Sequence, residues 1–158
     1  MRSQAGKLIL WMIAILGIVW SCQNQTVFDQ NIHVNPKGWN KDEIARFDIP
    51  IEDTLSFYSV NMFLRNDNNY SYQNIYFFMD IVSPEKKIQR DTIEIILADL
   101  KGRWLGTGFG AVKESDILLN SKVRFPHSGV YTFQFTQAMR DDNLAGINDI
   151  GLKVAKSK

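Results

Sequence analysis

The chain has few of the residues from which cross-links and metal sites are built. Among its 158 residues there is one cysteine, Cys22, and a single cysteine excludes an internal disulfide and a cysteine zinc cluster. The two histidines are His33, near the start of the mature chain, and His127, in a predicted turn. Neither position suits a histidine-based metal centre or nucleophile. We therefore expect no cofactor and no metal ion.

An excess of charge of either sign is also missing. The chain has 18 basic and 17 acidic residues, and the basic residues are scattered singly along it. A nucleic-acid-binding domain normally carries a basic patch or stripe. We therefore expect no nucleic acid among the partners.

Catalytic motifs are absent as well. No G-x-S-x-G nucleophile elbow occurs. Gly106, Gly108 and Ala111 match the G-x-G-x-x-G/A nucleotide pattern, but no amphipathic helix and no acidic residue about 20 positions later follow them. Asp67 and Asn69 begin like a calcium loop that lacks its glycine and its closing glutamate. We predict that the protein is not an enzyme; a structural ion and a buried carboxylate pair are the minor alternatives.

The only long apolar run occupies residues 8–20, after Arg2 and Lys7. A basic start followed by a run of this length is typical of a secretory signal, and the run is shorter than the roughly 20 residues of a spanning helix. Val19-Trp20-Ser21-Cys22 looks like the lipobox of a bacterial lipoprotein, in which the cysteine is acylated and becomes the new N-terminus. Trp20 departs from the small or aliphatic residue that is usual there.

These features predict a lipoprotein signal peptide in residues 1–21, a covalent lipid such as palmitate on Cys22, and a tether in residues 22–27. More than one acyl chain would make the attachment to the membrane effectively permanent. The alternative is an uncleaved N-terminal anchor with an incidental cysteine. Both place the rest of the chain in the cell envelope, and the lack of an acidic cluster after Cys22 favours a periplasm-facing position.

Residues 28–158 predict one all-β domain. Apolar and polar residues alternate in segments 45–51, 55–65, 91–99, 130–139 and 150–154, which is the period of a strand with one buried face. Segment 74–82 is apolar on both faces, and segment 116–125 is also strand-like. About seven or eight strands with no helix of useful length predict an antiparallel β-sandwich, of which a jelly roll is one form.

The connections are rich in turn residues. Residues 66–69 and 126–129 are predicted hairpin loops, and residues 83–87 are a predicted turn. Residues 140–146 are predicted to form a short helical turn or loop. Residues 27–41 show no sustained period, but Phe28, Val34 and Trp39 could lie across a sheet.

The glycine-rich segment 102–110 is the least ordinary part of the sequence. Its glycines exclude a helix, yet Trp104, Leu105 and Phe109 carry more apolar surface than a solvated loop normally keeps. This combination predicts a backbone that lies tightly over the core or under a partner. The candidate interaction surface comprises Tyr70, Tyr72, Trp104, Gly106, Gly108 and Phe109. Its rings would bind protein or stack on sugars; the alternative is that they cover the ends of the core.

Three stretches carry a more specific pattern. They are Arg65-x-x-x-x-Tyr70-x-Tyr72-x-Asn74, then residues 91–110 with Trp104-Leu105-Gly106-x-Gly108, then residues 129–152 with Gln137-Ala138-Met139-Arg140 and Leu144-x-Gly146. Together with the lipobox, they resemble the gliding-motility lipoprotein GldH family over nearly the whole chain. The resemblance implies an envelope lipoprotein needed for bacterial gliding, without known enzymatic activity. The family also occurs in bacteria that do not glide.

Two hypotheses about function remain. In the first, the protein is a non-catalytic, lipid-anchored accessory component of the gliding machinery that contacts envelope proteins through an exposed apolar surface. In the second, it is a glycan- or peptidoglycan-binding module that uses Tyr70, Tyr72, Trp104 or Phe109.

Overall fold

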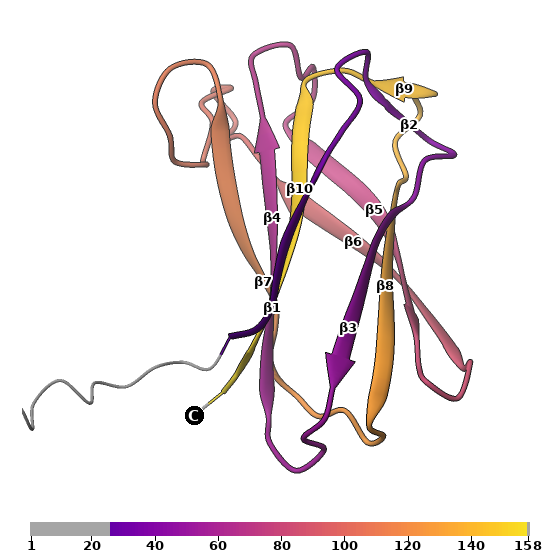
Figure 1. Ribbon diagram of the computed structural model, residues 1–158. Coiled ribbons are helices and arrows are strands. Elements are labelled where there is room, and N and C mark those ends of the chain that lie inside the picture. The colour runs from indigo at the N-terminus through magenta and orange to yellow at the C-terminus, as the bar shows by residue number, and fades with distance from the viewer. Residues whose placement is uncertain (1–25, 158) are drawn as a thin grey trace, which may run out of the picture.

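The structure of the protein, a computed structural model, describes residues 26–157 as two facing four-stranded sheets in which all neighbouring strands are antiparallel (Figure 1). The first sheet has the order β1 (Thr26–His33), β10 (Ile147–Lys156), β4 (Tyr58–Asn66), β7 (Lys113–Val123). The second has the order β3 (Ala45–Ile51), β8 (Gly129–Gln137), β5 (Asn74–Val82), β6 (Ile88–Ile96). A small ladder joins β2 (Trp39–Asn40) to β9 (Asn143–Leu144).

The strand order is that of a jelly roll. If the eight long strands are numbered along the chain, the two sheets read 1-8-3-6 and 2-7-4-5, which is the double Greek-key arrangement. The predicted all-β antiparallel sandwich and the predicted number of long strands are therefore confirmed. Residues 26–157 contain no helix, so none of that part is a helix long and apolar enough to cross a bilayer.

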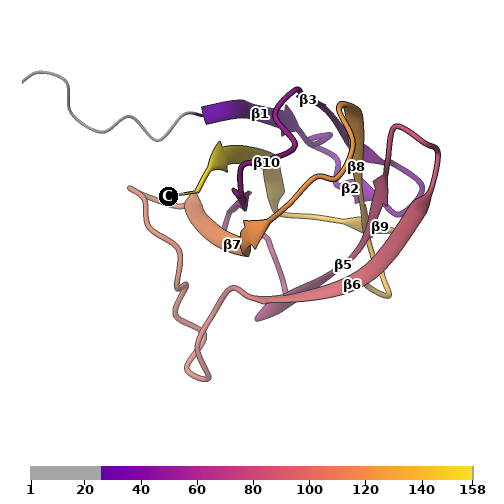
Figure 2. The same cartoon turned by 90° about the horizontal axis from the view of Figure 1, so that it is seen from below.

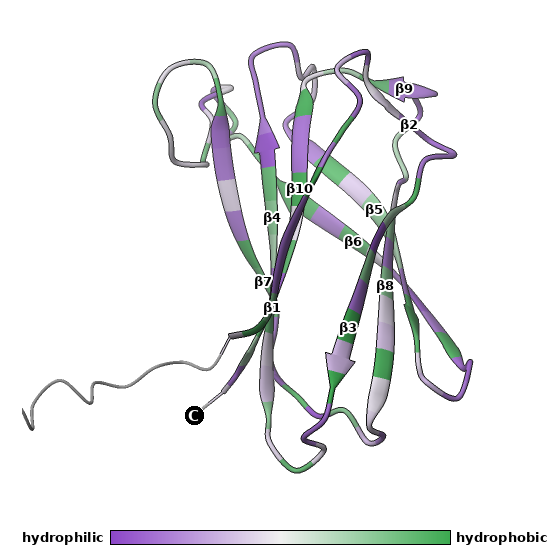
Figure 3. Ribbon diagram, in the orientation of Figure 1, coloured by the Kyte–Doolittle hydropathy of each residue, from purple (hydrophilic) through white to green (hydrophobic). Residues whose placement is uncertain are grey.

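The core lies between the sheets and is built by alternation. Hydropathy alternates along the strands (Figure 3), and in β4 every second side chain is buried, namely Tyr58, Val60, Met62 and Leu64. Phe135 in β8 lies at the centre of the second sheet, with its ring centroid 6.0 Å from that of Phe47 and 6.4 Å from that of Phe77. Each such side chain contributes about 1.5–3 kcal/mol when it is fully buried, so this layer supplies the main driving force for folding.

Strand β1 is not predicted by the sequence pattern. It lies at the edge of the first sheet, and only Val27, Phe28 and Ile32 of its eight residues are even half-buried. A strand with so little buried surface needs no alternation of apolar residues. It begins at Thr26, two residues before the predicted start of the domain.

Two predicted hairpins are wrong. Strands β4 and β5 lie in different sheets, as do β7 and β8, so residues 66–69 and 126–129 belong to crossings between sheets. Left-handed backbone is also absent from 66–69: within residues 26–157 the only non-glycine residue with positive φ is Lys86, in the β5–β6 turn. Residues 140–146 form a loop that contains β9, so the loop alternative of that prediction holds and the helical turn does not. Turn residues favour a reversal of the chain, but they do not specify the strand with which the next segment pairs.

Strand β5 is central in its sheet, but only its inner face is covered. Ile75 and Phe77 are buried, whereas Tyr76 is 37% and Phe78 is 43% exposed. The sequence pattern, apolar on both faces, therefore marks a central strand whose outer face is open in the isolated protein.

The sandwich has two distinct ends (Figure 1). The end that carries Thr26, the last residues of β10 and connections 52–57, 83–87 and 124–128 is called the tether end, and Figure 2 views the molecule from that side. The opposite end, called the distal end, carries the β2–β9 ladder and connections 67–73, 97–112 and 138–142. Strand β10 has ten residues and runs from one end to the other, so the ends are about 30 Å apart at roughly 3.3 Å per residue.

Candidate functional site at the distal end

Three of the predicted site residues come together at the distal end. Tyr70 and Tyr72 lie on connection 67–73, and Trp104 lies on connection 97–112. The ring centroid of Tyr70 is 5.8 Å from that of Tyr72 and 6.3 Å from that of Trp104. Aromatic pairs at such separations attract each other beyond the burial of their area. The three rings therefore join two connections that are distant in the sequence.

Tyr70 is buried, which corrects its prediction as part of an exposed surface. Its residue is 4% exposed, and its hydroxyl donates to the carbonyl oxygen of Asn74 at 2.7 Å. Burial raises the pKa of the Tyr70 phenol well above its usual value, because the charged phenolate is poorly solvated there. Tyr70 thus supports the distal connections from below, as the alternative interpretation of the aromatics predicts.

Tyr72 and Trp104 are half-buried and use their polar atoms inside the protein. The Tyr72 hydroxyl donates to Asp141 Oδ2 at 2.8 Å, and this hydrogen bond raises the pKa of the Tyr72 phenol. The Trp104 Nε1–H donates to Asn68 Oδ1 at 3.1 Å. These two bonds connect the three distal connections to one another, so the rings form a common floor for them.

Connection 97–112 is ordered by its own hydrogen bonds. Leu105 donates its backbone N–H to the Leu97 carbonyl at 2.8 Å, and Thr107 and Glu114 exchange two backbone bonds of 2.8 and 2.7 Å. Within the first turn, the Asp99 carboxylate accepts the backbone N–H of Arg103 and pairs with its guanidinium, which lowers the pKa of Asp99. The connection is therefore a built structure and not a slack loop.

Gly106 and Gly108 serve the backbone geometry of this connection. A Cβ atom on Gly106 would lie 2.7 Å from the carbonyl oxygen of Glu114. Gly108 has a φ of 143°, and a Cβ there would lie 2.7 Å from the carbonyl oxygen of Val112. Both contacts are closer than side chains allow, so glycine is required. No helix follows, so the pair does not form a phosphate-binding turn.

The same connection presents large apolar side chains to solvent. The exposed fractions are 97% for Leu100, 59% for Leu105, 102% for Phe109 and 40% for Val112. We call these four residues the distal apolar set. Exposed apolar side chains gathered in one region are a sign of an interaction site, because their burial against a partner is favourable. Of the predicted site residues, Phe109 is the one that is fully available to a partner.

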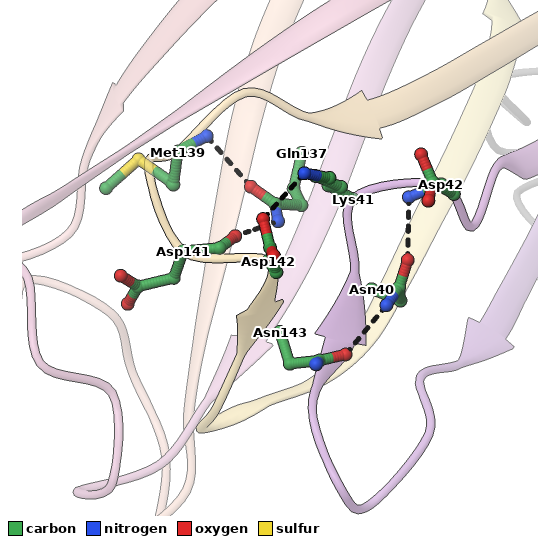
Figure 4. Close-up of polar contacts among 8 residues, drawn as sticks. All are labelled: Asn40, Lys41, Asp42, Gln137, Met139, Asp141, Asp142 and Asn143. Atoms are coloured by element: carbon green, nitrogen blue, oxygen red, sulfur yellow. Dashed lines mark hydrogen bonds and ion pairs between the residues drawn. The ribbon is translucent and has the colours of Figure 1, made fainter.

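A polar network holds the neighbouring segment 137–143 (Figure 4). Gln137 is buried; its amide donates to the Asp141 carbonyl at 2.7 Å and accepts the backbone N–H of Met139 at 2.8 Å. Lys41 pairs with Asp142 at 2.6 Å, which raises the pKa of Lys41. The Gln137–Arg140 motif therefore has a structural explanation as a self-bonded turn.

A row of charged side chains crosses the outer face of the first sheet near the distal end. Arg65 in β4 pairs with Glu114 in β7 at 2.6 Å and lies 3.8 Å from Asp149 in β10. His33 in β1 contacts the same Asp149. These residues link all four strands and show no arrangement of nucleophile, base and oxyanion donors.

A cleft of about 470 Å³ opens toward the tether end, between β6 and β7, which are edge strands of the two different sheets. Val60, Ile81 and Phe133 are among its apolar lining, and Lys87 and His127 are among its polar lining. Its volume lies in the usual range of small-molecule sites. The sequence did not reveal this cleft, because its lining comes from five strands and two connections. In residues 26–157 no group of three or more His, Cys, Asp and Glu side chains is placed to hold a metal ion.

Comparison with known proteins places the chain in a family. The family model described as GldH lipoprotein matches residues 26–154. A protein of Christiangramia forsetii named gliding motility lipoprotein GldH homolog is 34% identical over 144 residues, which cover 87% of this chain and 88% of that protein. The gliding motility lipoprotein GldH of Flavobacterium johnsoniae is 33% identical over 153 residues, which cover 92% and 93%.

Among solved structures, dimeric latent PorU from Porphyromonas gingivalis resembles the chain at a TM-score of 0.33 and 9% identity, over 87% of this chain and 14% of that one. A likeness this weak does not establish a shared fold. The sequence matches, by contrast, extend over most of both partners in each comparison. On that basis the chain belongs to the GldH lipoprotein family.

Proposed function

We propose that this protein is a lipid-anchored, non-catalytic accessory component of the gliding machinery, which binds envelope proteins through the distal apolar set. The names of its relatives support the link to gliding. The observation that supports protein contact is the exposure of Leu100, Leu105, Phe109 and Val112 on one ordered connection. A surface that is already ordered loses little conformational freedom on binding, which favours affinity.

The proposed anchor is Cys22, which lies outside the residues that the structure describes. Thr26 follows it by four positions, so the lipid and the sandwich are at most about 14 Å apart along the chain. The tether end then faces the membrane. The distal apolar set, about 30 Å further away, faces the envelope space.

Site-specific crosslinking in intact cells tests this function. A photo-crosslinking amino acid in place of Phe109 is expected to capture a defined protein, and the capture is expected to disappear when Leu105→Ser is added. The matched control is the same crosslinker in place of Ile88, which is 69% exposed and lies at the tether end. Equal capture from both positions, or no protein captured from Phe109, would contradict the proposal.

The lipid anchor is tested separately. Cells grown with labelled palmitate are expected to label the protein, and Cys22→Ser is expected to abolish both the label and the membrane attachment. An unlabelled wild-type protein would contradict the anchor.

Glycan binding is the alternative function. It requires sedimentation of the protein with purified peptidoglycan and loss of sedimentation in Trp104→Ala. Trp104 is half-buried, so one part of its ring is free to stack on a sugar.

A further inference from the structure

Connection 52–57, between β3 and β4, carries two exposed apolar side chains at the tether end. Leu55 is 77% exposed and Phe57 is 41% exposed. The connection lies at the foot of the molecule in Figure 1, beyond the ends of both sheets. Such side chains are costly to leave in water and gain free energy in any apolar surroundings.

The connection lies close to the point where the chain leaves for Cys22. Thr26 pairs with Ala155, and Ala155 pairs with Ser59, so these three residues form one row across β1, β10 and β4. Phe57 precedes Ser59 by two residues, and its carbonyl accepts the N–H of Ser157 at 2.8 Å. The connection therefore extends beyond the row by about 7 Å or more, on the side where the tether begins.

A single carboxylate holds the connection in an outward conformation. Asp53 accepts the backbone N–H groups of Leu55 and Ser56 at 2.9 and 3.1 Å and the Ser56 hydroxyl at 2.6 Å. It also pairs with Lys156 of β10 at 2.6 Å. Leu55 is thus held on a turn that is bonded to the sheet, and it does not fold back into the core.

Cations flank the two apolar side chains. Lys122 Nζ lies 4.8 Å from the centroid of the Phe57 ring, and Arg124 Nε donates to the Thr54 carbonyl at 3.1 Å. The acidic groups of the connection are Asp53, which is paired with Lys156, and Glu52. Apolar tips with basic side chains at their sides are the pattern by which peripheral proteins bind an anionic bilayer surface.

We propose that connection 52–57 is a second membrane contact, in which Leu55 and Phe57 enter the interfacial layer of the bilayer that holds Cys22 and Lys122 and Arg124 face lipid phosphates. This inference rests on the proposed lipid anchor. Attachment at a single point alone would leave the orientation of the sandwich unfixed, whereas two contacts orient it. The distal apolar set is then held away from the membrane and toward its partner.

The test uses the full-length lipidated protein in vesicles of phosphatidylethanolamine and phosphatidylglycerol. Cys22 is the only cysteine of the chain, so Leu55→Cys provides one free thiol for the environment-sensitive fluorophore NBD. The matched control is Leu105→Cys, which is also exposed but lies at the distal end. NBD at position 55 is expected to emit at shorter wavelength and to be quenched by lipids with doxyl-labelled acyl chains, and NBD at position 105 is expected to show neither effect.

Each outcome separates the two proposals. Attachment of two fluorophores per chain means that Cys22 is free, so the lipid anchor has failed. One fluorophore per chain without quenching at position 55, or with equal quenching at positions 55 and 105, overturns the second membrane contact while the anchor stands. Phe57→Ser in the labelled Leu55→Cys protein is expected to reduce the quenching, and unchanged quenching would exclude Phe57 from the contact.

Discussion

At the distal end, apolar side chains stand on a connection of 16 residues, and at the tether end they stand on one of six. The distal connection rests on the ring of Tyr70 and has its own backbone ladder. The connection at the tether end depends on Asp53 and is flanked by cations. A broad, supported surface suits a folded partner, whereas two apolar tips between basic groups suit a lipid surface. The two ends of one sandwich therefore expose similar residues in different surroundings, and for that reason we propose a different partner for each end.

The largest expected effect concerns the support of the distal end. Gly146 has a φ of 79°, and a Cβ there would lie 2.1 Å from the Tyr70 nitrogen. Gly146→Ala is expected to destabilise the protein by about 3 to 5 kcal/mol, because left-handed strain and a clash with backbone add together. Urea unfolding of the detergent-solubilised protein, followed by circular dichroism, measures the change.

Gly110→Ala is the matched control for that substitution. Gly110 has a similar φ of 69°, but nothing lies within 4 Å of its Cβ position. The expected cost is strain alone, about 1–2 kcal/mol. Equal costs at the two glycines would mean that the close contact between Gly146 and Tyr70 does not support the distal end.

The next largest effect is the loss of stability when the hydroxyl of one buried tyrosine is removed at each end. The Tyr70 hydroxyl donates to the Asn74 carbonyl at 2.7 Å, and the Tyr58 hydroxyl donates to the Asp53 carbonyl at 2.6 Å. Tyr70→Phe and Tyr58→Phe are each expected to cost about 0.5–1.5 kcal/mol at pH 7, the usual contribution of one such bond.

These tyrosines also predict a dependence on alkaline pH. Burial raises the pKa of both phenols in the folded state. The two phenols therefore contribute fully to the free energy of unfolding below the unfolded pKa of about 10. This contribution is lost as the pH rises through the folded pKa. The difference in stability between wild type and each Phe variant should shrink above pH 10. A constant difference from pH 8 to pH 11 would contradict the assignment.

A smaller effect is expected from the carboxylates that hold the two connections. Hydrogen bonds from Lys156, Ser56 and Leu55 keep the pKa of Asp53 far below its usual value, and those from Arg103 lower the pKa of Asp99. Both carboxyl groups have a lower pKa in the folded state than in the unfolded state. The two carboxylates therefore stabilise the folded state above the unfolded pKa of about 4, and this stabilisation is lost as the pH falls through the folded pKa.

The variants Asp53→Asn and Asp99→Asn should therefore be less stable to unfolding than wild type at pH 7. At acid pH their free energies of unfolding should approach that of wild type. Hydrogen exchange at pH 7 should show faster exchange in residues 53–57 for the first variant and in residues 99–105 for the second. Faster exchange at the opposite end in either variant would show that the two connections are coupled rather than independent.

The smallest effect on stability is expected from the distal apolar set itself. The double variant Leu105→Ser and Phe109→Ser should stay within about 0.5 kcal/mol of wild type, because both side chains are already in water. Leu105→Ser alone is also the substitution that is expected to abolish capture by the crosslinker at position 109. A large drop in the unfolding midpoint would instead mean that these side chains stabilise the connection.

Much of the fold could be predicted, because a strand with one buried face has alternating apolar and polar residues in its sequence. Tyr58, Val60, Met62 and Leu64 alternate in the sequence and are all buried in β4. β1 shows no such alternation, because an edge strand that is largely exposed on both faces does not require alternating apolar residues. The partners of the strands were not predictable, because a turn sequence such as 126–129 serves a hairpin and a crossing equally well.

The candidate site was predictable only in part. Sequence reasoning found the aromatic and glycine residues, since their types are unusual for a loop. It did not separate the buried Tyr70 from the exposed Phe109, because burial at a loop depends on which other connection covers it. Leu55 and Phe57 gave no signal at all, since two apolar residues beside a strand look like part of that strand.

By itself, the sequence determined the class of the fold, the membership of the family and the features that predict a lipid anchor, because these depend on local order along the chain. Only the tertiary structure decided the jelly-roll pairing, the burial of Tyr70 and the placement of Leu55 and Leu105 at opposite ends. Those properties arise from contacts between segments that are far apart in the sequence, and the period of a single strand carries no information about them.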